Sequence, residues 1–128
     1  MAQDSAGISH VSVVAVHVQD QERALGFYTG VLGFEVRMDA PYGDGARWLE
    51  VAPAEGQAAV ALIPAHDDVV AGVDTGVRLV AEDAERAHAA LAAAGTDVDQ
   101  EIARWPGVPP MFSFRDPDAN VLYVVQRA

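Results

Sequence analysis

The chain alternates short apolar segments with polar turns, beginning with a valine-rich stretch at residues 8–18. Valine favours β-strand, and both faces of this segment are mostly apolar, which is typical of a strand covered on both sides. Asp20 then supplies a carboxylate suited to a helix N-cap, and Gly33 permits the left-handed conformation that ends a helix. Between them, one helical stripe is apolar and contains Ala24, Phe27, Tyr28 and Val31.

The second half of the chain repeats this plan. The segment Asp20-Gln21-Glu22-Arg23-Ala24 recurs as Asp83-Ala84-Glu85-Arg86-Ala87, with four of the five residues identical. A predicted strand at residues 76–81 precedes the second helix, and Gly95 follows it. The buried face of this helix is expected to contain Ala84, Ala87, Leu91 and Ala94.

Three further strands are expected after each helix. In the first half they lie at residues 34–38, 47–51 and 58–63, with turns at 42–45 and 53–56. In the second half they lie at residues 97–102, 111–114 and 121–126, with a turn at 116–120. The sequence therefore predicts an α+β fold in which one domain, residues 1–128, contains two βαβββ modules at 8–63 and 75–127, joined by a linker at 64–74.

Composition narrows the classes of function. Apolar residues make up 51% of the chain, enough for a packed core. Eight arginines, no lysine and 19 acidic residues give a net charge of −11, which disfavours nucleic acid and anionic membranes as partners. The absence of cysteine excludes disulfides and thiolate metal sites. Without a signal-like start or an apolar run of about 20 residues, the chain is expected to be cytoplasmic.

Two motifs carry a resemblance to a known family. The first motif is Asp20…Ala24-Leu25…Phe27-Tyr28…Leu32-Gly33-Phe34. The second is Phe114-Arg115-Asp116-Pro117-Asp118-Ala119-Asn120, in which Ala119 replaces a usual glycine. Both resemble signatures of the vicinal oxygen chelate superfamily. That group includes glyoxalase I, bleomycin-resistance proteins, fosfomycin-resistance enzymes and extradiol dioxygenases. Arg47-Trp48-Leu49…Val51-Ala52-Pro53 is similar to its bleomycin-resistance-like branch. The resemblance implies curved mixed sheets forming a cupped cavity, and a homodimer.

The resemblance also implies where a divalent ion would be held in metal-dependent members. The corresponding positions here are Val13, Val60, Gly76 and Tyr123. Valine and glycine side chains have no donor atom, and a lone tyrosine is an uncommon ligand, so we expect neither a metal site nor a cofactor. A β-bulge that turned His10 toward the position of Val13 would change this expectation.

Other side chains are expected to face the cavity and bind a small molecule. Trp48 and Glu50 share one face of their strand, and Glu50 is also the candidate general base. Arg78 could bind a carboxylate or phosphate, and Trp105 lies in a loop stiffened by three prolines. The full expected ligand-binding set is Val13, His17, Trp48, Glu50, Arg78, Trp105, Met111 and Tyr123.

Two classes of function remain open from the sequence. The first is metal-independent binding of a small molecule, such as sequestration of a drug or natural product. The second is a metal-dependent lyase, isomerase or dioxygenase with an unusual ligand set, such as His10 or His17 with Glu50. A metal-free enzyme that uses Glu50 as its base is a third alternative.

Overall fold

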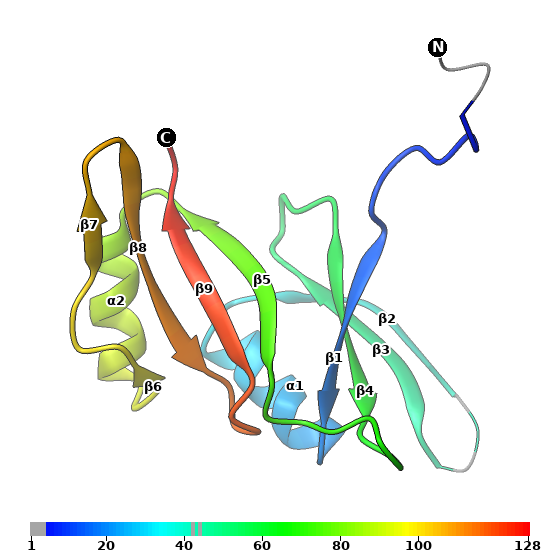
Figure 1. Ribbon diagram of the computed structural model, residues 1–128. Helices are drawn as coiled ribbons and strands as arrows, with labels where there is room; N and C mark the ends of the chain where they lie inside the picture. Colours follow the sequence, from blue (N-terminus) through cyan, green and yellow to red (C-terminus); the bar gives the residue numbers. More distant parts are fainter. Residues whose placement is uncertain (1–4, 42, 44) are drawn as a thin grey trace.

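The computed structural model describes residues 5–41, 43 and 45–128, so Tyr42 and Asp44 of the predicted turn lie outside the described residues. It contains two helices and nine strands in two mixed sheets (Figure 1), which confirms the predicted fold class. The first module contains β1 (Val13–Val18), α1 (Gln21–Gly30), β2 (Glu35–Pro41), β3 (Arg47–Ala52) and β4 (Ala59–Pro64). The second contains β5 (Asp74–Ala81), α2 (Ala84–Ala93), β6 (Asp97–Val98), β7 (Ala103–Trp105), β8 (Val108–Arg115) and β9 (Val121–Gln126).

The two sheets have matching strand orders. The first runs β1-β4-β3-β2 and the second runs β5-β9-β8-β6, with β7 paired to β8. In each sheet the first and last strands of the module are parallel neighbours, and the remaining pairs are antiparallel. No helix of the described chain is long and apolar enough to cross a membrane.

The helix boundaries follow the predicted caps. Asp20 accepts hydrogen bonds from the backbone N–H groups of Glu22 and Arg23, at 3.0 and 3.1 Å, and Asp83 accepts one from Arg86 at 3.1 Å. Gly33 and Gly95 follow the helices with φ of 75° and 82°. Most residues of the two predicted stripes are buried or half-buried against the core. Val31 and Ala94 are the exceptions and are exposed, because they follow the ends of α1 at Gly30 and of α2 at Ala93.

The predicted first strand is longer than the observed one. We expected residues 8–18, but β1 begins at Val13, where its pairing with Ala59 of β4 begins. Residues 5–12 extend away from the body (Figure 1), and Ile8 is 84% exposed. A strand needs a neighbouring strand for its backbone hydrogen bonds, and for the residues before Val13 the single chain offers almost no such neighbour.

The second module also departs from prediction. The expected strand at 97–102 is reduced to β6, and part of the expected proline-rich loop forms β7 and the start of β8. Pro109 and Pro110 lie within β8, between the two positions where that strand pairs with β7. Proline cannot donate a backbone hydrogen bond, so these residues occupy a gap in the pairing between β7 and β8 rather than breaking the strand.

A turn at residues 116–120, which we call the inter-module turn, joins the two modules through buried side chains. Asp116 accepts a hydrogen bond from the Tyr28 hydroxyl of α1 at 2.8 Å. Asn120 is fully buried and donates to the backbone carbonyl of His17 in β1 at 2.8 Å. Ala119, which replaces the glycine usual in this motif, has a φ of 65° and so adopts the left-handed conformation suited to that glycine.

The contact between Tyr28 and Asp116 makes stability sensitive to alkaline pH. Burial raises the pKa of Tyr28 above its usual value near 10, and the Asp116 carboxylate raises it further. The unfolded chain therefore loses this proton before the folded chain does, so stability from this group is complete below about pH 10 and is lost as pH rises further. Urea unfolding from pH 7 to 11 should show this loss. In Tyr28→Phe the alkaline loss should be smaller, with about 1–2 kcal/mol less stability at pH 7; an unchanged alkaline slope would contradict the assignment.

Candidate functional site

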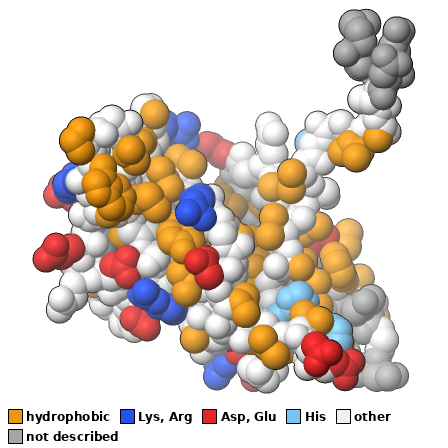
Figure 2. Space-filling model, in the orientation of Figure 1, with side chains coloured by type: hydrophobic (Ala, Val, Ile, Leu, Met, Phe, Trp, Pro, Cys, Tyr) orange, Lys and Arg blue, Asp and Glu red, His pale blue; other side chains and the backbone are white. Residues whose placement is uncertain are grey.

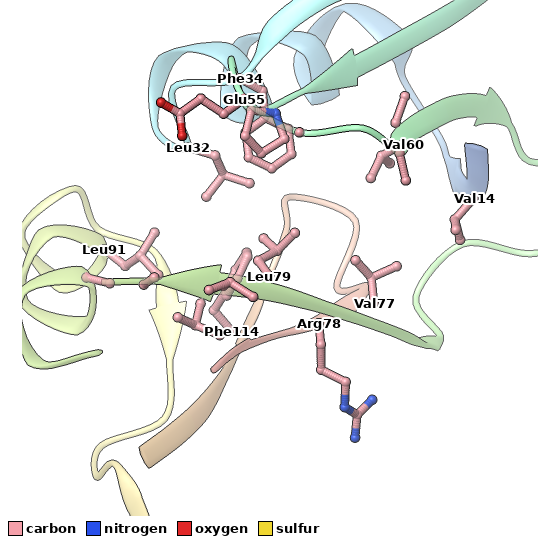
Figure 3. A pocket seen from close by; sticks show the side chains of 18 of the residues that line it. Val14, Leu32, Phe34, Glu55, Val60, Val77, Arg78, Leu79, Leu91 and Phe114 are labelled. Carbon is pink, nitrogen blue, oxygen red and sulfur yellow. The ribbon is translucent and has the colours of Figure 1, made fainter. Parts of the chain in front are cut away.

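A cleft of about 830 Å³ lies between the two modules, on the side of the sheets that faces the helices (Figure 3). Its volume is in the range of small-molecule sites. The lining comes mostly from hydrocarbon side chains, contributed by both sheets and by both helices or the residues that follow them. The principal ones are Val14, Leu32, Phe34, Val60, Val77, Leu79, Leu91 and Phe114.

Strand alternation places these side chains in the cleft. Val14 of β1 and Val60 of β4 are paired, so their side chains project from the same face of the first sheet. In β5, Val77 and Leu79 are half-buried against the core, while Arg78 between them is exposed. Figure 3 shows Val77 and Leu79 directed toward Val60 and Phe34 across the cleft. The two modules thus contribute opposing hydrocarbon walls.

Three charged residues line the described cleft: Glu55, Arg78 and Arg127. The Arg78 side chain points away from it (Figure 3), and its guanidinium lies 4.2 Å from the centre of the Tyr123 ring on the other side of the sheet. Arg127 donates a hydrogen bond to Glu82. The interior of the cleft is consequently apolar, with charge at its edge.

Most of the ligand-binding residues predicted from the sequence lie on the faces of the two sheets that point away from the helices and the cleft. We call these faces the open faces. On the first open face, the Trp48 indole N–H donates to Glu50 at 2.6 Å. Glu50 pairs with Ala61 of β4, and Val13 and His17 project on this same side of β1. This sheet brings Val13, His17, Trp48 and Glu50 to one face, away from the cleft.

The second open face carries Arg78, Met111 and Tyr123. Tyr123 lies between Arg78 of β5 and Ser113 of β8, and its hydroxyl donates to Asp74 at 2.6 Å. This hydrogen bond lowers the pKa of Asp74 and raises that of Tyr123. Trp105 of β7 is 57% exposed. The predicted residues therefore form two separate groups within one chain, rather than one enclosed site.

The family model of the glyoxalase/bleomycin resistance protein/dioxygenase superfamily matches residues 7–124. The chain belongs to this superfamily. The antibiotic-binding protein TnmS3 from Streptomyces sp. CB03234 has 32% identity and a TM-score of 0.85, over 97% of this chain and 100% of that one. A superfamily member from Sphaerobacter thermophilus has 31% identity and a TM-score of 0.88, over 94% and 99%.

A curated relative matches a shorter segment of this chain. The uncharacterized protein YetH of Bacillus subtilis (strain 168) is 40% identical over 57 residues, which are 44% of this chain and 48% of YetH. The match spans about half the length of that relative.

The side chains at the superfamily's implied metal positions do not fit an ion. Val13 lies on the first open face, whereas Val60 faces the cleft, so these two positions do not even share one side of the sheet. Gly76 has no side chain, and Tyr123 is bonded to Asp74. Within the described residues, no three His, Asp or Glu side chains are grouped closely enough to hold a metal.

His10 lies before β1, and its ring nitrogen is 2.6 Å from the Ser9 hydroxyl. The pairing of β1 with β4 is continuous over the described strand, without the bulge that would reorient a side chain.

The sequence does not predict the hydrocarbon side chains that line the cleft. Of the expected ligand-binding residues, Arg78 alone is among the described lining residues, and its side chain points away from the cleft. The available signal was alternation: residues 8–18 have two apolar faces, and only the face containing Val13 was assigned to a cavity. Val14, on the other face, is not among the expected ligand-binding residues, yet it is 37% exposed and lines the cleft. The separation of the two modules, which opens this face, is a tertiary property that strand alternation does not encode.

Proposed function

We propose that the protein binds an apolar, partly aromatic small molecule in the cleft without a metal ion, and acts by sequestering it. The observation that carries the proposal is the hydrocarbon lining of an 830 Å³ cleft between the modules. The similarity in length and fold to TnmS3, which is an antibiotic-binding protein, supports the proposal.

The expected driving force is burial of apolar surface. Burial contributes roughly 25 cal/mol per Å², so covering about 200 Å² of a two-ring ligand contributes about 5 kcal/mol before the costs of association. Sequestration requires only that the ligand is bound and so removed from solution. Binding by apolar burial needs neither a general base nor a metal ion.

Calorimetry with a panel of aromatic natural products and antibiotics tests the proposal. At least one compound is expected to bind with the same affinity in buffer with and without EDTA. Elemental analysis of protein purified without chelators provides the second measurement. A stoichiometric zinc, nickel, manganese or iron signal, or binding that EDTA abolishes, would overturn metal independence.

We further propose that the protein is a cytoplasmic homodimer in which a second copy covers the open faces. Apolar side chains are exposed on both sheets, and Figure 2 shows such side chains gathered over the second one. Met38 is 48% exposed and Val80 is 64% exposed. Exposed apolar patches of this kind are typical of interaction surfaces. Light scattering on the calorimetry samples measures the mass, and a monomer at micromolar concentration would contradict the dimer.

A further inference from the structure

We infer that two copies of the chain join through strands, with residues 6–11 and β1 of one copy paired to the outer edge of β5 in the other. The inference rests on the homodimer of the proposed function and names its contacting strands. We call residues 6–11 the arm. It leads toward β1 and extends away from the body of the molecule (Figure 1). Every residue of the arm is exposed, with Ile8 at 84% and Val11 at 64%.

The arm resembles a strand that needs a neighbour. Ile8 and Val11 are β-branched residues, which favour strands, yet within the described chain the arm pairs with no strand. The contact with β4 nearest to the arm is made by the Ser12 carbonyl, which accepts a hydrogen bond from the Ala59 N–H at 3.0 Å. Extended segments of this kind add to the exposed sheet edge of another chain.

Among the strands that end the two sheets, β5 offers the most suitable edge. It pairs only with β9 in the described chain, and its regular part, residues 78–81, contains Val80 at 64% exposure. At the end of the first sheet, β2 carries a charged residue at every second position, and charged side chains on an edge strand oppose strand addition. β6 and β7 contain two and three residues, which leave little edge to pair.

Charge favours the same pair of strands. The net charge of −11 makes two copies repel each other, so a contact between them is best made where charge is low. Residues 6–18, which comprise the arm and β1, contain no Asp, Glu, Arg or Lys. In β5 the charges of Asp74 and Arg78 cancel. The two contacting segments therefore carry no net charge.

Twofold symmetry closes this contact. When the arm and β1 of one copy pair with β5 of its partner, the same axis places the partner's arm and β1 against β5 of the first copy. The terminal edges of β1 and β5 are then covered in both copies. Neither strand retains an edge that would recruit a third copy, so we expect a closed dimer.

Cross-linking tests the contact cleanly, because the natural chain contains no cysteine. The double variant Val11→Cys/Val80→Cys, treated with a short bismaleimide at low protein concentration, is expected to give a covalent dimer on a denaturing gel. Val11→Cys and Val80→Cys alone should remain monomeric bands, because neither residue meets its own counterpart. The control is Val11→Cys/Val70→Cys, since Val70 is 55% exposed and lies outside the contacting strands. It should also remain monomeric.

Light scattering over a dilution series provides a second measurement. Ile8→Asp/Val11→Asp should raise the dimer dissociation constant about tenfold or more, because it places like charges in both contacts. Val69→Asp/Val70→Asp adds the same charge at exposed valines of the linker and should leave the constant unchanged. Both variants should keep the thermal stability of the isolated chain.

The outcomes separate this inference from the proposals on which it rests. A dimer that shows no Val11–Val80 cross-link would disprove the strand assignment while the homodimer stands. Equal cross-linking by Val11→Cys alone would show that the two arms meet each other, and it would also disprove the pairing with β5. A monomeric wild-type protein would refute both the homodimer and this inference. Calorimetry with the ligand panel decides the proposed binding function separately.

Discussion

Replacing Ala90 with tryptophan is expected to weaken ligand binding by about tenfold or more, a loss of at least about 1.4 kcal/mol in binding free energy. Ala90 lies on the exposed surface of α2 and lines the cleft. An indole added at this position would occupy space that the ligand requires. Because the position is exposed, the larger side chain need not overpack the core. Calorimetry with any compound that binds the wild-type protein measures the effect.

Ala89→Trp is the matched control. Ala89 neighbours Ala90 on the same helix and is also exposed, but it does not line the cleft. Both substitutions carry the same helix-propensity cost, so their thermal stabilities should be similar. Equal affinities for the two variants would show that the ligand binds elsewhere, and the open faces that carry Trp48 and Tyr123 would become the first alternative.

Replacing Asn120 with alanine is expected to destabilise the protein by about 3 kcal/mol or more. The Asn120 side chain accepts hydrogen bonds from the backbone N–H groups of Gly72 and Val73, at 2.8 and 3.1 Å. It donates to the carbonyl of His17 and to Asp116. Alanine would remove all four hydrogen bonds of a fully buried side chain, and the N–H groups of Gly72 and Val73 would lose this acceptor. Urea unfolding at pH 7 measures the difference.

Two further variants qualify this result. Asn120→Asp keeps an acceptor for Gly72 and Val73 but removes the donor and places a second carboxylate beside Asp116, so it should also destabilise the protein. Gln100→Ala, at an exposed position, should change stability by less than about 0.5 kcal/mol. A similarly small change in Asn120→Ala would show that the inter-module turn does not hold the modules together.

The local sequence predicts much of the fold because the decisive signals are local. Asp20 and Asp83 cap their helices through backbone groups two or three residues away, and Gly33 and Gly95 follow the helices with positive φ. Strand alternation likewise places Trp48 with Glu50 on a shared face. Each of these features depends on residues close in the chain.

The cleft could not be predicted in the same way. Its walls come from residues far apart in sequence, such as Val60 and Leu79, and its existence depends on how the two modules pack. The sequence also predicts the inter-module turn only as a chain reversal, whereas Asp116 and Asn120 are buried and hydrogen-bonded to the first module. Partners that distant are not visible in a single sequence.

The span of these bonds has a consequence for folding kinetics. Tyr28 and Asp116 are 88 positions apart, and His17 and Asn120 are 103 apart. Closing loops of this length costs entropy before any contact compensates for it, so helices and hairpins can form early while the union of the halves comes late. A half-chain cut in the 64–74 segment would retain its own turns and caps but would leave the Tyr28 hydroxyl without its acceptor. Each half therefore depends on the other to reach its final packing.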